Sequence, residues 1–233
     1  MKILLKKIIY LLFISQIFAI AGFGLYGDND FLSHNGNTDS ENYFTIKSNP
    51  FNNTYGGGFY IYIDAIPFID LEINGETALN LHESIFSAPN LNIDFEGKLP
   101  WARTSLYLTA RKKIVGLSVP FLAKARLFAG GGMNMHRVTP EYTLDLLLDA
   151  YPDENGLEDI FDLINGDTEA LKTLGSHVKD NMNSITGIHL QTGLQAKLLM
   201  LDMFLNARYT LAKDIIPGRI GFPSLWLGIG IGI

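Results

Sequence analysis

The sequence predicts an all-β protein that closes into an antiparallel transmembrane β-barrel of about eight strands, with one long helical loop. Side chains alternate one by one between apolar and polar or glycine over 186–197, 202–213 and 225–233. A strand sends successive side chains to opposite sides, so each run gives a sheet one apolar and one polar face. Beyond the start of the chain, 225–233 is also the longest unbroken apolar run. Because only helices and closed barrels satisfy their backbone groups in lipid, a membrane-embedded form would cross with strands.

Residues 1–21 are predicted to be a cleaved signal peptide. Three lysines lie within the first seven residues, an apolar stretch follows over 8–20, and Ala19 and Ala21 supply the small-x-small pattern of a cleavage site. Cleavage after Ala21 leaves a single mature domain, 22–233. The alternative is a retained membrane anchor, but the apolar stretch is short for a span of about 20 residues.

One acidic segment carries the charge imbalance of the mature domain. The whole chain has 18 basic and 24 acidic residues, and removal of the three leader lysines leaves 15 against 24, or −9. Residues 141–180 hold eleven acids and two lysines, which is also −9, so the remainder is balanced. No nucleic-acid partner is expected, because phosphate binding needs a basic face. The chain has no cysteine, which excludes disulfides, thiolate metal ligands and thiol catalysis.

Eight strands are expected, because a single-chain barrel with both termini on one side needs an even number. The first starts at Gly22 and precedes a polar loop over 28–55, and the second runs over 59–73 with a bend at Pro67. Asn74-Gly75 predicts a turn after it. The other six expected strands lie over 91–96, 106–111, 121–128, 186–197, 202–213 and 225–233. Division of the second strand at Pro67 and a further strand in 79–88 would give ten strands, which is the alternative.

The longest loop, 139–184, is predicted to contain two or three short helices. Thr139 is suited to an N-cap and Pro140 to the first helical position, and apolar residues at helical spacing over 157–164 predict a second helix. Asp167 is suited to cap another helix. Loops of this length tend to be functional or disordered, so we expect the acidic segment 141–180 to meet an extracellular or envelope partner.

The pattern resembles the small outer-membrane β-barrel proteins of Gram-negative bacteria, of the OmpA/OmpX-like kind. The resemblance is carried by the leader, Gly22-Phe-Gly-Leu-Tyr-Gly27, the run Ala125–Gly132 and Ala207-Arg208-Tyr209-Thr210, and it covers most of the mature chain. It implies a location in the bacterial outer membrane, termini facing the periplasm, and contact with outer-membrane lipid and the barrel insertion machinery. We expect a monomer. Such proteins usually end in Phe or Trp, whereas this chain ends in Ile233.

If the apolar faces meet lipid, the charged side chains of the strands line the interior. An eight-stranded barrel has room for side chains and little else, and unpaired buried charge is costly, so we predict a network of paired charges that plugs the barrel. In this network Asp94 and Glu96 are expected to face Arg111 on the adjoining strand. Solvated surface charge on an open sheet is the alternative. The predicted network consists of Asp70, Glu72, Asp94, Glu96, Arg111, Lys124, Arg126, Lys197, Asp202 and Arg208, and Arg103 is expected to point inward as well.

No cofactor, metal site or catalytic site is predicted. Gly22–Gly27 matches a dinucleotide fingerprint in its letters but lacks the strand-to-helix setting that the fingerprint needs. Asp153-x-Asn155-Gly156 matches part of a calcium loop, but Tyr151 would occupy the first ligand position, so a solvated acidic face is favoured over calcium. The five histidines show no ligand spacing. Ser176-His177 has no acid that the sequence brings near it, so no enzyme is expected.

Three functions remain open. The leading hypothesis is a structural or surface-interaction protein of the outer membrane with a plugged interior. A narrow pore or transporter for small molecules is the second. A soluble periplasmic ligand-binding barrel is the third, and it would turn Ile188 and Leu190 inward and leave His189 and Gln191 in water.

Overall fold

The computed structural model describes residues 21–41, 44–64, 69–88, 92–119, 122–152, 159–160, 162–163 and 167–232. Most of the predicted signal peptide, Pro67 and the Asp153–Gly156 motif therefore lie outside the described residues. No helix among the described residues is long and apolar enough to cross a membrane.

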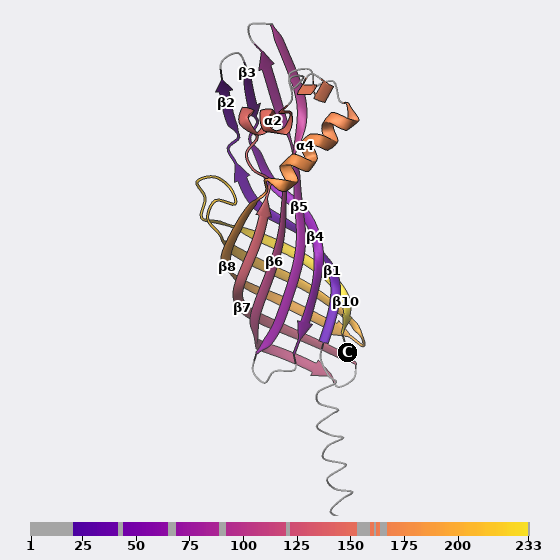
Figure 1. The fold of residues 1–233 in the computed structure, drawn as a ribbon. Helices are drawn as coiled ribbons and strands as arrows, with labels where there is room; N and C mark the ends of the chain where they lie inside the picture. Colours follow the sequence, from indigo (N-terminus) through magenta and orange to yellow (C-terminus); the bar gives the residue numbers. More distant parts are fainter. Residues whose placement is uncertain are drawn as a thin grey trace, which may run out of the picture.

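Eight antiparallel strands close into a ring (Figure 1). The ring order is β5-β4-β1-β10-β9-β8-β7-β6, and β6 pairs back with β5. β1 and β10, the first and last strands, pair from Gly22↔Gly232 to Asp30↔Ser224. The ring therefore has no free edge, and the predicted fold class is confirmed. Its strands are β1 (Ala21–His34), β4 (Phe51–Ile63), β5 (Asp70–Ala88), β6 (Ile93–Val119), β7 (Ala123–Val138), β8 (Asn183–Leu198), β9 (Leu201–Leu211) and β10 (Gly221–Gly232).

The count of eight is right, but the strands in the first half of the chain differ from the prediction. The single strand expected over 59–73 is two strands, β4 and β5, paired with each other. Paired residues face the same side, and Ile63 pairs with Leu71, so odd positions point outward both before and after the turn. Parity alone could not distinguish this hairpin from a bent strand.

Two further boundaries also change. Asn74-Gly75 is not a turn but lies inside β5, which continues through 79–88. The strands expected over 91–96 and 106–111 are parts of one strand, β6. The two errors cancel, because one predicted strand is divided and two are joined.

A protrusion extends β5 and β6 beyond the ring, at the end opposite the C-terminus (Figure 1). We define it as β2 (Asn37–Glu41), β3 (Phe44–Ser48), the outer ends of β5 and β6 (83–88 and 93–99), α2 (Leu144–Ala150) and α4 (Thr168–Asp180). β3 pairs with the outer end of β5, and both helices lie between β7 and β8 in the chain. An apolar cluster that includes Ile46, Leu147 and Leu174 joins the helices to β3.

The helix caps follow local chemistry. Asp167 caps α4 as predicted, because its carboxylate accepts hydrogen bonds from the backbone N–H groups of Glu169 and Ala170. Thr143 caps α2, whereas the predicted cap Thr139 bonds instead to the backbone of Ala102 on β6.

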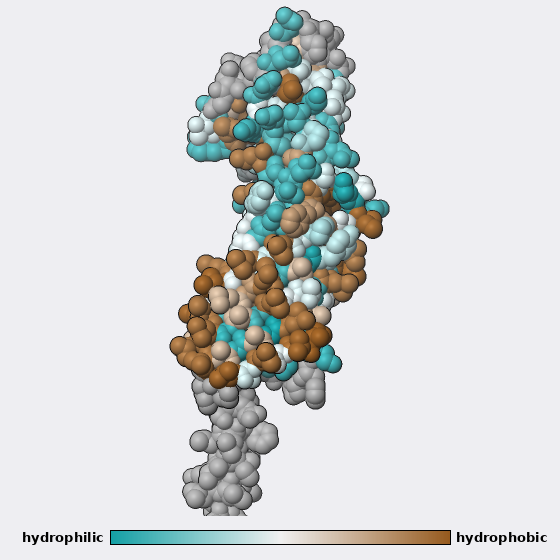
Figure 2. Space-filling model, turned by 180° about the vertical axis from the view of Figure 1, so that it is seen from behind, coloured by the Kyte–Doolittle hydropathy of each residue, from teal (hydrophilic) through white to brown (hydrophobic). Residues whose placement is uncertain are grey.

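The ring is apolar outside and polar inside. On β8, Leu190 is 63% exposed whereas His189 is 1% exposed, and the same alternation runs through β9 and β10. Apolar surface spreads over the ring, and hydrophilic surface over the protrusion (Figure 2). A barrel in a bilayer requires this distribution, and it is the reverse of the arrangement that the soluble hypothesis needs.

Candidate functional site

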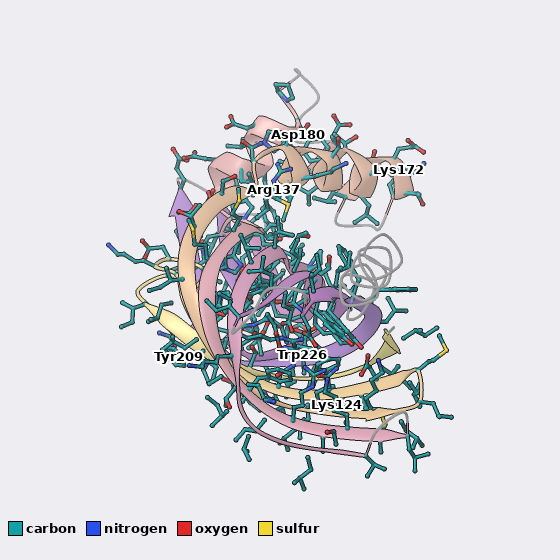
Figure 3. All side chains as sticks on the ribbon, turned by 90° about the horizontal axis from the view of Figure 1, so that it is seen from below. Lys124, Arg137, Lys172, Asp180, Tyr209 and Trp226 are labelled. Atoms are coloured by element: carbon teal, nitrogen blue, oxygen red, sulfur yellow. The ribbon has the colours of Figure 1, made fainter. Side chains whose placement is uncertain are left out.

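Side chains fill the interior of the ring. Figure 3 shows the ring from the end at which the C-terminus lies. Near that end, Arg111 lies between Glu72 and Asp64, with nitrogen–oxygen distances of 2.5 and 3.5 Å. Arg126 pairs with Asp64 at 2.7 Å and lies 3.9 Å from Asp70. Each arginine thus has carboxylates on two sides, which offsets part of the penalty of removing it from water. We call these five residues the lower network.

A second set of ion pairs, the upper network, lies nearer the protrusion. One terminal nitrogen of Arg103 contacts Asp30 at 2.6 Å and Glu76 at 2.8 Å. Arg208 approaches the other oxygen of Glu76 at 3.3 Å and donates to Asn74 at 2.9 Å. All four charged side chains are at most 2% exposed. Removal of Arg103 would leave Asp30 without its ion-pair partner, and removal of Glu76 would leave Arg208 without its own.

Gln191 connects the two networks. Its amide nitrogen donates to Glu72 at 3.0 Å, and its amide oxygen accepts from Arg208 at 3.3 Å. The guanidinium groups also stack on aromatic rings, Arg208 at 3.8 Å from the centroid of Tyr107 and Arg111 at 4.3 Å from that of Phe128. Such cation–π contacts stabilise a desolvated guanidinium further. The upper and lower networks therefore belong to one connected assembly.

An aromatic cluster packs inside the ring beside these networks, and glycines make room for it. The cluster consists of Tyr26, Tyr60, Tyr62, Phe204 and Trp226. A Cβ at Gly22 would collide with the ring of Tyr62, and one at Gly228 would lie 2.9 Å from Trp226. The glycines of Gly22–Gly27 and 228–232 that face inward thus permit close packing. β1 is followed in the chain by β2, whereas a nucleotide site would require a helix there.

An apolar lid closes the ring at the end that carries the protrusion. We define this lid as Leu32, Phe51, Trp101, Val138, Ala212, Ile215, Ile216 and Phe222. His34 stacks on Phe51 with 5.0 Å between ring centroids, and His82 lies 5.1 Å from the same ring. Both histidines lie beyond the last large exposed apolar residues of their strands, Phe31 and Leu81. Burial lowers the pKa of both imidazoles, so they pack in their neutral form.

The structure brings most of the predicted network residues to the interior. Asp202 accepts hydrogen bonds from Tyr62 and, at 2.8 Å, from Gln195. Glu72, Arg111, Arg126, Asp202 and Arg208 are buried, and Asp70, Lys124 and Lys197 are half-buried.

Asp94 and Glu96 do not face Arg111, and that prediction is wrong. Both are exposed, and both lie on the same strand as Arg111, opposite Ser87 and Ile85 of β5. Both residues lie in the outer end of β6, which belongs to the protrusion, so their side chains face water there and not the interior of the ring.

Sequence reasoning missed four interior carboxylates, those of Asp28, Asp30, Asp64 and Glu76. Asp28 and Asp30 fell in the predicted polar loop, and Glu76 followed the predicted turn. The signal was present in the parity of β1, whose even positions from Gly22 to His34 all point inward. The acids simply continue that alternation.

The remaining candidates lie in the protrusion. The hydroxyl of Tyr151 donates to the carbonyl oxygen of Ala170 at 2.6 Å, so this residue holds α4 in place. Ser176 is exposed, and His177 bonds to Asn181 at the end of α4, so both lie in the protrusion.

No protein-family model matches the chain, and no curated protein matches it in sequence. Among solved structures it is similar to Ail of Yersinia pestis, with 9% identity, 92% of this chain and 99% of that chain covered, and a TM-score of 0.43. It is similar to the outer membrane protein OprG from Pseudomonas aeruginosa, with 9% identity, coverage of 92% and 93%, and a TM-score of 0.46. For Neisserial surface protein A the values are 10% identity, 91% and 96% coverage, and 0.41. These likenesses span nearly the whole chain at very low identity.

Proposed function

We propose that this protein is an integral protein of the bacterial outer membrane, in which a closed, charge-filled barrel supports an exposed acidic protrusion that contacts other molecules. The observation that carries the proposal is the reversed distribution of side chains. Arg103 and Glu72 are 0% exposed inside the ring, whereas Leu117 and Leu25 on its outer face are 79% and 68% exposed. In water, so large an apolar surface would be an aggregation hazard, whereas lipid solvates it.

The interior supports a structural role better than conduction. The two networks and the aromatic cluster fill the ring side by side, and the apolar lid closes its end. A ring of eight strands leaves little space once such side chains fill it. The barrel thus acts as an anchor whose own core is polar.

The protrusion supplies the surface for interaction. On its helices Asp145, Asp149 and Asp180 are exposed. Lys172, one of the two lysines of 141–180, already pairs with Glu169 at 2.7 Å. This surface favours a basic partner, either at the cell exterior or in the envelope.

Expression in a Gram-negative host tests the location and the orientation together. We expect the mature chain in the outer-membrane fraction, with slower gel migration after boiling. Trypsin added to intact cells should cut after the exposed residues Lys172 and Lys179 and leave the ring protected. Recovery in the soluble periplasmic fraction would overturn the proposal.

Bilayer recording tests the closed interior. The purified protein, reconstituted in a planar lipid bilayer, should give no large and stable conductance. Steady single-channel conductance would instead favour the pore hypothesis.

A further inference from the structure

Three buried carboxylates converge beside the upper network. Asp28 and Asp30 project inward from β1 and Glu76 from β5, and one oxygen of each lies within 4.8 Å of the others. The three residues are 7%, 0% and 5% exposed. They meet although a third strand separates β1 from β5.

Two glycines of the intervening strand β4 make this convergence possible. Gly56 pairs with Asp28, and Gly58 pairs with Glu76. A Cβ at Gly56 would lie 2.7 Å from a carboxylate oxygen of Asp28, and one at Gly58 would lie 2.9 Å from the Cβ of Glu76. The carboxylates therefore occupy space that any other residue on β4 would fill.

The oxygens of this cluster are unequally satisfied. Those of Glu76 accept from Arg103, Arg208 and Tyr26. The Oδ2 atom of Asp30 accepts from Arg103 and Thr54. In contrast, neither oxygen of Asp28, nor Oδ1 of Asp30, has a hydrogen-bond partner among the residues that the structure describes. A buried carboxylate without a partner is too costly to persist uncompensated.

A count of the charges inside the ring also finds an imbalance at these three carboxylates. Around the upper network the three carboxylates face two arginines, Arg103 and Arg208, which leaves −1. Near the lower network the described inward charges balance, four acids against four bases. They are Asp64, Asp70, Glu72 and Asp202, and Arg111, Lys124, Arg126 and Lys197. One positive charge is therefore missing, and it is missing beside Asp28.

We propose that Asp28, Asp30 and Glu76 bind one hard monovalent cation of about the size of sodium, with Asp28 as its principal ligand. Oxygen atoms within 4.8 Å of one another can surround an ion whose metal–oxygen bonds are about 2.3–2.6 Å. The all-oxygen donor set selects hard cations over soft transition metals. A single charge neutralises the cluster, whereas a divalent ion would leave it positive beside two arginines. The cation links β1 to β5 across β4.

Refolding in defined salts tests this site. The mature chain, unfolded in urea, is refolded into detergent micelles at pH 8 in sodium, potassium, calcium or choline chloride at equal ionic strength. Because a ligand of the folded state raises its stability, we expect melting in sodium to occur roughly 5 °C above melting in choline. Asp28→Asn keeps the shape of the side chain and removes its charge, so this difference should disappear in the variant.

Asp202→Asn is the matched control. Asp202 is buried, but Tyr62 and Gln195 already satisfy it. Its variant should melt lower in every salt and retain the sodium dependence. Persistence of the sodium dependence in Asp28→Asn would overturn the proposal.

The wild-type protein supplies a test that needs no variant to fold. Protein refolded in sodium chloride and desalted into a sodium-free choline buffer should retain one sodium ion per chain by elemental analysis. Absence of bound sodium, together with a melting temperature that is the same in every salt and rises as the pH falls, would show that a proton alone compensates Asp28. Stabilisation by calcium alone would overturn the assignment to a monovalent ion.

Discussion

β6 passes through two regions in which the roles of its faces are reversed. Within the ring, its odd positions, such as Arg103 and Tyr107, are polar and inward, and its even position Leu106 is apolar and exposed. In the protrusion, Leu99 at an odd position packs on the apolar cluster of the helices, and Glu96 at an even position is exposed. The backbone geometry is the same. The medium outside the strand, lipid or water, decides which face carries the polar residues.

The largest expected effect comes from the upper network. Arg103→Ala removes the shared partner of Asp30 and Glu76. Buried Asp30 then has no ion-pair partner, and Glu76 keeps only Arg208. We expect the free energy of unfolding to fall by about 3–5 kcal/mol, measured by urea titration in lipid vesicles. In the protrusion, Lys172→Ala breaks an exposed ion pair with Glu169 and should change the free energy of unfolding by about 0–1 kcal/mol. Equal effects of the two variants would contradict the contrast between the regions.

A charge on the lipid-facing surface should have the next largest effect. Leu194 on β8 is 54% exposed on the outer face of the ring. Leu194→Arg should destabilise the barrel by about 2–4 kcal/mol in vesicles, because the charge would lie in hydrocarbon. Asp145→Arg on the exposed surface of α2 should leave the unfolding curve unchanged. Tolerance of Leu194→Arg would indicate that this surface meets water.

Substitution of one glycine in each region tests how tightly the ring and the protrusion are packed, with a smaller expected effect. A Cβ at Gly22 would meet the ring of Tyr62 inside the barrel, whereas one at Gly97 would meet nothing within 4 Å among the described residues. Gly22→Ala should therefore lower the free energy of unfolding by about 1–3 kcal/mol through overpacking. Gly97→Ala should be neutral or slightly stabilising. The urea titration used for Arg103→Ala measures both, and a neutral Gly22→Ala would show that the aromatic cluster can shift.

The smallest effect concerns the apolar lid, which separates the two regions. Burial lowers the pKa of His34 and His82 below the ordinary value, so the unfolded chain binds more protons than the folded one. The contribution of the two neutral imidazoles to the stability of the folded state is present above a pH of about 6.5 and is lost as the pH falls below that value. Melting of wild-type protein at pH 8 and pH 5.5, compared with His34→Gln and with His82→Gln, measures it. The variants should lose less stability on acidification than the wild type.

The two halves of the chain differ in how far their sequence predicted them. Strands β8, β9 and β10 are consecutive in the chain with no further strand or helix between them, and their alternation located them closely. In the first half, β4 and β5 kept one parity across their turn, and β6 continued out of the ring, so the strand boundaries were wrong there. Because these boundaries were wrong, Asp28 and Glu76 were not predicted to lie on strands, and their carboxylates were not predicted to be in the interior. The alternation alone indicated which face each residue would take, but not that the strands extend as far as these residues.

The sequence by itself determined that the chain is a ribbon of two-faced strands with an apolar face for lipid and a charged face for the interior. Local alternation is enough for that conclusion, because it depends only on successive residues. The tertiary structure alone decided where each strand leaves the ring and which charges meet. Arg103 contacts Asp30 and Glu76 from distant parts of the chain. Such contacts depend on the register in which the ring closes, and no single strand contains that information.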